Sequence, residues 1–278
     1  MLSPGGEFET PSKWLEMGIE GMRMYPRFVE ELHTETGVPI DFQLCGSNYL
    51  VESEPARRRA EFQRTNGIQV NIIEQGLHYP DDGLVDPTDL LKALRVACEI
   101  RKVSLVEHHR LADIESADYG ALVIAAGAWS DQLRVTCHGR PVALPAVKPI
   151  RGHLISFDLP PGSLGPMRRR GHLYILQRAS GCTIAGSTEE DVGFDRTVDL
   201  KICLDIHERA EELFPPLAKV GPSRAWVGFR PYSPEGPHIG RIEGTNVWLA
   251  YGHYRNGILL APLTARRVAG EIMPESGL

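Results

Sequence analysis

Near the C-terminus a predicted strand, a glycine-flanked turn and a predicted helix follow one another, and this succession constrains the fold more than any other stretch. Residues 246–251 form an apolar run with the composition of a strand. After the turn, small and apolar residues recur with the spacing of one helical face, at Ala261, Ala265, Val268, Ala269 and Ile272. Pro262 agrees with a helix that contains it in its first turn, where an N–H has no intrahelical partner.

The turn itself, residues 252–257, begins and ends with a glycine. Glycine lets a backbone approach a ligand closely, and the helix that follows presents free N–H groups and the positive end of its dipole. An anionic or electron-rich ligand is therefore the expected occupant. An ordinary turn between a strand and a helix has the same glycines, so the glycines alone leave both interpretations open.

A second block lies in the middle of the chain. Residues 121–126 are apolar or small, as in a strand buried on both faces, and Gly127 follows them. A glycine at the end of such a strand lets the backbone pass close to a neighbouring group. Taken by itself, this pattern is also that of a plain core strand.

Both blocks resemble flavoprotein motifs. Residues 252–262, Gly-His-Tyr-Arg-Asn-Gly-Ile-Leu-Leu-Ala-Pro, resemble the C-terminal flavin-contacting signature of the D-amino-acid oxidase superfamily, most closely that of the glycine oxidases of thiamine biosynthesis. Residues 121–130 are similar to the strand and turn with which flavin oxidoreductases with two dinucleotide-binding domains return under the cofactor. The resemblance implies FAD as the cofactor, with contacts from Ala126, Gly127, Trp129, Gly252, His253, Tyr254, Arg255, Asn256, Gly257, Ile258, Leu259 and Leu260.

The same resemblance implies three substrate-binding residues. Arg230 follows a predicted strand and begins Arg-Pro-x-x-Pro-x-x-Pro-x-Ile-Gly, close to the glycine oxidase motif whose arginine grips the substrate carboxylate. A guanidinium suits such a bidentate grip, although an exposed or ion-paired arginine is the alternative. Tyr174 falls where the family has a tyrosine lining the pocket; a half-buried strand tyrosine is the alternative. Glu189 replaces an apolar residue of some glycine oxidases, and it could repel the substrate carboxylate or pair with its ammonium group.

The implied activity is oxidation of glycine or another small amino acid or amine, which gives an imino acid, then an oxo acid, and hydrogen peroxide from molecular oxygen. The hydride chemistry belongs to the cofactor, so the chain supplies orientation and electrostatics, and no acid–base residue is required. A D-amino-acid dehydrogenase or a sarcosine-oxidase-like enzyme is the alternative within the enzyme class. A non-catalytic truncated remnant is the alternative outside it.

The pattern of elements predicts an α/β protein, α+β overall. Helical spacing covers 12–36, 54–66, 89–98 and 200–213, and 42–51 is strand-like with a turn or bulge at 45–47. Short strands at 142–144, 153–157, 172–176, 182–185 and 224–227 indicate an antiparallel sheet. The resemblance implies an incomplete two-dinucleotide-binding-domain FAD fold, with an FAD-binding domain of 1–36, 84–139 and 231–278 and an interleaved antiparallel-sheet substrate domain of 37–83 and 140–230.

Two features depart from the family. The segment 103–111 leads almost directly into Tyr119, where the family has a longer β-meander, and Gly-x-Gly-x-x-Gly, which binds the ADP half of FAD, does not occur. Residues 1–7 resemble the stretch that follows this unit in glycine oxidases. We therefore expect the 278-residue chain made alone to be poorly soluble or colourless. An upstream segment of roughly 40–50 residues, longer than a ~30-residue βαβ unit, should restore FAD.

Bulk properties exclude other classes. Lys and Arg number 30 against 36 Asp and Glu, so no basic excess points to nucleic acid, and Arg57, Arg58 and Arg59 are expected on a solvated helix face. The five cysteines are scattered, which favours a reducing cytoplasm and neither a disulfide framework nor a zinc site. His108 and His109 point to opposite faces of a strand, so no metal is expected. No apolar run approaches the roughly 20 residues of a membrane span. A homo-oligomer remains open.

Overall fold

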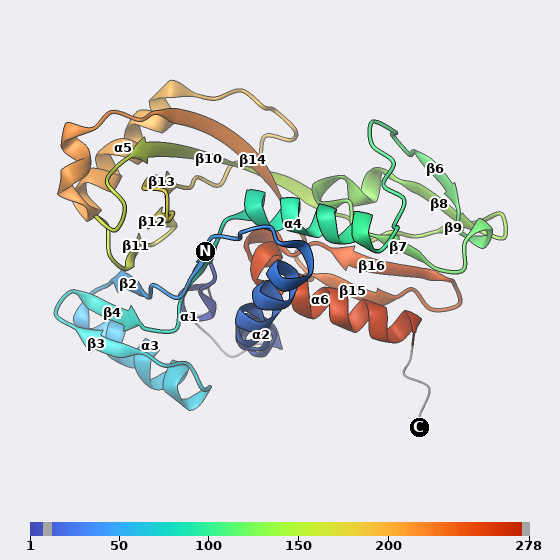
Figure 1. Cartoon of the computed structure of the whole chain (residues 1–278), viewed down its shortest axis with the longest axis horizontal. Helices are drawn as coiled ribbons and strands as arrows, with labels where there is room; N and C mark the ends of the chain where they lie inside the picture. Colours follow the sequence, from blue (N-terminus) through green and yellow to red (C-terminus); the bar gives the residue numbers. More distant parts are fainter. Residues whose placement is uncertain (8–12, 274–278) are drawn as a thin grey trace. The chain divides into compact units, whose positions relative to one another are not determined.

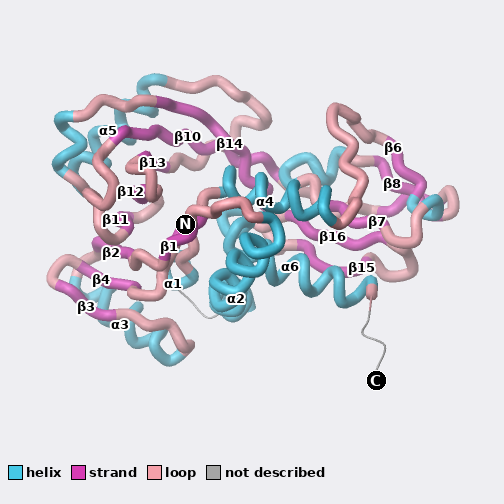
Figure 2. Tube along the Cα trace, viewed as in Figure 1, coloured by secondary structure: helices cyan, strands magenta, loops and turns pink. Residues whose placement is uncertain are grey.

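The computed structural model describes residues 1–7 and 13–273 (Figure 1). The chain forms two compact units of three segments each: the first is Met1–Val103, Gly152–Glu190 and Arg196–Gly228, and the second is Ser104–Arg151, Asp191–Asp195 and Phe229–Leu278. Helices and strands occur in both units (Figure 2), as the predicted α/β class requires. Which segments bind cofactor and which bind substrate stays a prediction.

The first unit is built on an eight-stranded sheet with the order β14-β10-β13-β12-β11-β2-β4-β3. Its strands are β2 (Ser47–Leu50), β3 (Asn71–Ile73), β4 (Gly76–Tyr79), β10 (Lys148–Asp158), β11 (Met167–Arg170), β12 (Leu173–Gln177), β13 (Cys182–Gly186) and β14 (Arg224–Tyr232). All described pairings are antiparallel except that of β11 with β2. A separate pair consists of β1 (Phe42–Gln43) and β5 (Leu84–Val85).

Helix α5 (Leu200–Leu213) covers part of this sheet, as predicted for 200–213. Its buried residues Cys203, Ile206, Ala210 and Leu213 recur every three or four positions, which places them on one helical face. They form one cluster with buried side chains of the strands, among them Ile155, Phe157, Ile175 and Ala185. Asp199 caps the helix by accepting a 2.8 Å hydrogen bond from the Lys201 N–H. The short helix η3 (Pro215–Lys219) follows.

Helix α2 (Lys13–Thr36) packs against α4 (Pro87–Ile100), and α3 (Ser53–Thr65) packs against β3 and β4. These bounds confirm the predicted helices within the described residues; the predicted first residue of α2, Ser12, lies outside them. Asp86 caps α4, where it accepts a 2.8 Å hydrogen bond from the Thr88 N–H, and Pro87 occupies the first turn. On the surface, the Arg101 guanidinium donates hydrogen bonds to both carboxylate oxygens of Glu35, at 2.7 and 2.8 Å.

Buried polar groups fix residues 2–7, which include the short helix α1 (Pro4–Glu7). The carboxyl group of Asp82 accepts hydrogen bonds from the hydroxyls of Ser3 and Ser47, and Gly5 O accepts from Arg59 at 2.7 Å and from Gln63 at 2.6 Å. Burial, opposed by the two serine hydrogen bonds, raises the pKa of Asp82 to about 7. The segment is therefore held by side chains from β2, α3 and the turn before β5.

The second unit contains two three-stranded sheets. One has the order β15-β16-β7 and comprises β7 (Leu122–Ile124), β15 (His238–Arg241) and β16 (Val247–Tyr251). The other has the order β6-β8-β9 and comprises β6 (Asp113–Glu115), β8 (Arg134–Cys137) and β9 (Arg140–Val142). Helix α6 (Gly257–Ile272) lies against β15 and β16, and short 3-10 turns occur at η1 (Ser116–Asp118), η2 (Gly127–Gln132) and η4 (Tyr254–Asn256). A cluster that includes Ile124, Val135, Val247, Leu249 and Tyr251 is its core.

Local predictions were wrong at Arg59, β14 and α6. Arg59 was expected on a solvated helix face, but its side chain is buried because it donates to Gly5 O. Strand β14 does not end before Arg230 but continues to Tyr232, because it is an edge strand in which Pro231 can lack a ladder donor. Helix α6 begins at Gly257, so Pro262 lies in its second turn rather than its first. Its buried face carries Leu259, Leu260, Leu263, Thr264 and Val268, and Ala261, Ala265 and Ala269 are exposed. Leucines bury more apolar area than alanines, which turns the helix toward them.

The segment 104–112 forms no strand, so the strand argument against a metal at His108 and His109 does not apply there. Across residues 1–7 and 13–273 there is no group of three or more His, Cys, Asp or Glu side chains placed to hold a metal ion. In the same described ranges, no helix combines the length and the apolar character needed to cross a membrane.

Replacing Asp82 by Asn should change how stability depends on pH. The folded pKa of about 7 lies above the ordinary 3.8, so this carboxyl group contributes stability at low pH that is lost as pH rises from about 4 to 7. At ~1.4 kcal/mol per pKa unit, the loss is on the order of 4 kcal/mol. Urea unfolding of Asp82→Asn across this window should lack that loss. The exposed neighbour variant Asp81→Asn should keep the wild-type pH dependence, and parallel curves for wild type and Asp82→Asn would contradict the prediction.

Candidate active site

The two turns expected to contact a flavin leave the same edge of one sheet in the second unit. Strands β7 and β16 are parallel neighbours, with Ile124 opposite Leu249. Ala126 and Gly127 follow the end of β7, and Gly252 and His253 follow the end of β16. Because the carboxyl ends of parallel strands meet at one edge, where open α/β sheets bind their ligands, the structure brings the two sequence blocks together.

Backbone conformation sets the shape of the second turn. Gly252 has φ +81° and Tyr254 has φ +51°, in the left-handed region that costs an ordinary side chain free energy. The Tyr254 ring is held edge-on against Tyr232 of β14, at 5.2 Å between ring centres. After Asn256 the chain enters α6, so the positive end of the helix dipole lies at this turn. The turn thus forms the entry to a helix N-terminus.

His253 ties this turn to the helix that follows it. Its ring is partly buried, and Nε2 lies 2.9 Å from the Thr264 hydroxyl on the buried face of α6. Burial, with a smaller effect from the neighbouring His238, lowers the pKa of His253 to about 4. Burial also lowers the pKa of His238, whose Nε2 lies 2.9 Å from the Ser233 hydroxyl. At neutral pH the turn is therefore supported by an uncharged imidazole.

A cavity of about 670 Å³ lies along the other turn. Ala126 and Trp129 are among its lining residues, which are His109, Arg110, Leu111, Ala112, Ile114, Leu122, Val123, Ile124, Ala125, Ala126, Trp129, Gln132, Leu133 and Phe194. Trp129 stacks on Phe194 at 5.0 Å between ring centres, and Phe229 meets both rings edge-on. The residues from 252 to 260 do not line this cavity.

These features fit a flavin cofactor. An added Cβ at Gly127, which has φ +58°, would meet no atom within 4 Å, so the backbone there is open to an approaching ligand. The strand before this turn is not buried on both faces as predicted, because β7 is an edge strand with Val123 exposed. The cavity wall combines aromatic rings with backbone at the end of β7, which suits a large planar ligand. FAD, when bound, would be held by the turns after β7 and β16.

Arg230 is a half-buried residue of β14 in the second unit. Alternate residues of a strand share a face, so Arg230 lies on the side of Tyr232, whose ring contacts Tyr254. Phe229 lies on the opposite side and contacts Trp129. The structure thus places Arg230 on the same side of the strand as the C-terminal turn.

Tyr174 and Glu189 belong to the first unit. Tyr174 of β12 pairs with Gly186 of β13, so Glu189, three residues later, emerges at the same end of this hairpin. His172, just before β12, places Nδ1 3.4 Å from the Glu189 carboxylate. The structure therefore brings these two predicted substrate residues together at one hairpin end.

Sequence reasoning missed four residues of these surroundings: His172, Phe194, Tyr232 and His238. Phe194 lies 65 positions after its stacking partner Trp129, and no spacing within one element links them. The sequence did contain a signal for Tyr232, which lies two residues after Arg230. It was missed because the strand was predicted to end before Arg230.

Replacing His253 by Gln should flatten part of the acid side of the stability curve. The folded pKa of about 4 lies below the ordinary 6.5, so the unfolded chain binds a proton that the folded chain does not. Stability should therefore fall as pH drops from about 6.5 to 4, by on the order of 3 kcal/mol at ~1.4 kcal/mol per unit. Urea unfolding of His253→Gln should lack this fall, and the exposed-site variant His138→Gln should keep it.

Comparison with known proteins places this geometry in a family. The model of the FAD-dependent oxidoreductase family matches residues 1–271. The glycine oxidase of Geobacillus kaustophilus is 29% identical over 97% of this chain and 80% of its own length, and its crystal structure matches with a TM-score of 0.88 at 27% identity, covering 99% of this chain and 83% of the other.

Two further relatives carry other names. The bifunctional protein ThiO/ThiG of Synechocystis is 30% identical over 99% of this chain and 45% of its own length. The hydrogen cyanide synthase subunit HcnC of Pseudomonas aeruginosa is 25% identical over 95% of this chain and 72% of its own length. The family match over nearly the whole chain and the shared fold agree with the two turns at one sheet edge. The chain therefore belongs to the FAD-dependent oxidoreductases of the D-amino-acid oxidase type.

Proposed function

We propose that this protein oxidises glycine or another small amino acid or amine with FAD and molecular oxygen, giving an imino acid, which hydrolyses to an oxo acid, and hydrogen peroxide. The observation that supports this proposal most is that Arg230 lies on the same side of β14 as Tyr232, whose ring contacts Tyr254 in the turn after β16. A fixed cation beside a flavin turn suits a substrate that has a carboxylate next to its oxidised carbon. The similarity to a glycine oxidase over 97% of the chain supports the same substrate class.

Each residue has a definite task. The Arg230 guanidinium holds the substrate carboxylate through two parallel N–H donors, which fixes the direction of the Cα–H bond. Tyr174 limits the size of the group that the substrate carries on Cα. The chemistry that FAD supplies when bound is acceptance of a hydride from Cα.

The α6 N-terminus has an electrostatic task. Its dipole favours negative charge at the turn of residues 255–260, where the flavin ring would be held. His253 carries no charge at neutral pH, because burial lowers its pKa to about 4. The stabilisation therefore comes from the backbone and the helix dipole, with no contribution from a charged imidazole.

The pathway and the compartment belong to the proposal as well. We place the reaction in the supply of an imino acid for the thiazole of thiamine, in the cytoplasm. Similarity to a ThiO/ThiG protein over 99% of the chain supports the pathway. The five scattered cysteines, all of them free thiols in the structure, agree with a reducing compartment.

A second candidate is a dehydrogenase that passes its electrons to an acceptor other than oxygen. The similarity to a hydrogen cyanide synthase subunit over 95% of the chain supports a family member with a different product. The two candidates share the carboxylate grip and the flavin turns. They differ in the electron acceptor and in the fate of the imino acid.

The products decide between them. The protein loaded with FAD should release hydrogen peroxide with glycine, sarcosine and D-alanine, and more slowly with D-phenylalanine, because Tyr174 restricts the pocket. Oxygen uptake, peroxide and cyanide should be measured across this panel. Cyanide formation, or turnover only with an artificial electron acceptor, would favour the second candidate. Faster turnover of D-phenylalanine than of glycine would contradict the predicted substrate size.

Removing the guanidinium should weaken substrate binding. Arg230→Ala should raise the apparent KM for glycine strongly, because loss of a charge-assisted bidentate contact costs on the order of 2–4 kcal/mol. Arg230→Lys should recover only part of the loss, because an ammonium cannot form the same fork. Steady-state kinetics on the FAD-loaded variants measure the change, with Arg224→Ala on the exposed start of β14 as the control. A near-normal KM for Arg230→Ala would remove Arg230 from the site.

A further inference from the structure

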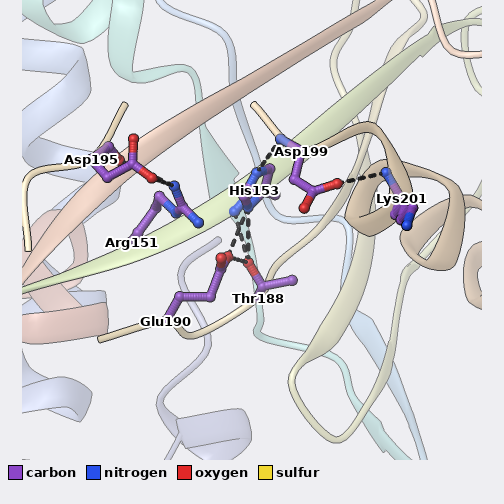
Figure 3. A network of polar contacts seen from close by, with 7 residues as sticks. All are labelled: Arg151, His153, Thr188, Glu190, Asp195, Asp199 and Lys201. Atoms are coloured by element: carbon purple, nitrogen blue, oxygen red, sulfur yellow. Dashed lines mark hydrogen bonds and ion pairs between the residues drawn. The ribbon is translucent and has the colours of Figure 1, made fainter. Parts of the chain in front are cut away.

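His153 is a histidine with no exposed surface, in the middle of β10 (Figure 3). Its Nε2 lies 3.0 Å from the backbone N of Asp199, and a backbone N–H can only donate. Nε2 must therefore be the unprotonated acceptor, and the ring proton sits on Nδ1. Nδ1 donates to the Glu190 carboxylate at 2.7 Å. The contacts thus fix both the neutral state and the tautomer of this side chain.

The two partners of His153 mark the two ends of one loop. Residues 187–199 connect β13 to α5, and His153 binds Glu190 near the start and Asp199 at the end. Thr188 reinforces the first end: its hydroxyl donates to Glu190 at 2.5 Å and accepts from the His153 backbone N–H at 2.9 Å. Asp199 is also the capping residue of α5. One imidazole therefore closes the intervening loop, residues 191–198.

This loop carries side chains of both predicted functional regions. Glu189 stands just before the Glu190 anchor, and Phe194 lies within the loop and lines the 670 Å³ cavity against Trp129. By chain membership residues 191–195 belong to the second unit, whereas both anchor points belong to the first. Asp195 has its own partner there, a 2.6 Å ion pair with the buried Arg151.

We propose that His153 is a positioning residue: its neutral imidazole closes the loop 191–198 through Glu190 and Asp199 and thereby sets Phe194 against Trp129 in the cofactor cavity. The assignment of that cavity to FAD rests on the proposed function; the closure of the loop does not. Holding the two ends of a loop together removes much of the chain entropy that would otherwise oppose placing its middle.

The hydrogen-bonding groups of His153 determine which substitutions preserve its links to Glu190 and Asp199, which together form the clamp. A neutral histidine offers one donor and one acceptor at opposite ends of a short planar group, and a glutamine amide offers the same pair. His153→Gln should therefore preserve both links, whereas the apolar His153→Leu fills the space and removes both. A role as mere core filling predicts the reverse order, because leucine is the better apolar filler. The pair of variants separates the two roles.

Limited proteolysis tests whether His153 closes the loop, and it requires no enzyme activity. The loop contains exposed Arg196, so trypsin cleavage after this residue, followed by mass spectrometry, reports loop opening. Cleavage there should be faster in His153→Leu by on the order of ten-fold or more, as expected for loss of hydrogen bonds to a charged group. It should stay near wild type in His153→Gln. His207→Gln, which changes a histidine of α5 outside the clamp, should also stay near wild type. Equal cleavage of His153→Leu and wild type, or equally fast cleavage of His207→Gln, would overturn the proposal.

The link from the loop to the cavity needs a second measurement. Fluorescence titration should show an FAD Kd raised on the order of ten-fold in His153→Leu and almost unchanged in His153→Gln. Faster cleavage of His153→Leu with an unchanged FAD Kd would contradict the proposal that His153 positions Phe194 in the cavity. If wild type binds no FAD even when it is extended by the upstream segment, the proposed function fails, and the cleavage rates still decide whether His153 closes the loop.

Discussion

The candidate site depends on the parallel pairing of β7 with β16. Each strand is short and is followed by a turn that contains glycine, and neither turn alone would define a ligand site. Parallel register brings their carboxyl ends to one edge, so backbone groups 125 residues apart in sequence, after Ile124 and after Leu249, lie at the same edge of the sheet. Tyr254 and Tyr232 then attach β14, with Arg230, to this edge. The proposed flavin turns and the proposed carboxylate-binding role of Arg230 therefore both depend on this edge.

Two buried ionisable groups give the protein opposite responses to acid. Asp82 prefers its neutral form because burial removes water from the carboxylate, so acid favours its folded environment. His253 also prefers its neutral form for the same reason, but for a base the neutral form is the deprotonated one, so acid opposes it. Asp82 binds the segment at residues 2–7 through the Ser3 hydroxyl, and His253 belongs to the turn after β16. The uncharged form of Asp82 therefore stabilises the first unit at low pH, and the uncharged form of His253 stabilises the second unit at higher pH.

Much of the fold could be predicted from the sequence, because strong periodic signals and caps mark most helices. The spacing at Cys203, Ile206, Ala210 and Leu213 fixes α5, and Asp86 with Pro87 fixes the start of α4. The flavin turns were predicted because glycines and a motif mark them. The end of β14 was wrong, since a proline stops a central strand but not an edge strand. His153 and Phe194 carried no local signal, because their roles depend on partners that only tertiary structure brings near.

The interleaving of the two units has a consequence for how such a protein can be divided. Each unit is made of three chain segments, and residues 191–195 belong to the second unit although the chain on both sides belongs to the first. No single contiguous fragment reproduces either unit, and a cut anywhere between 104 and 228 removes part of both. One unit therefore cannot be exchanged between relatives by swapping a single contiguous stretch of the chain.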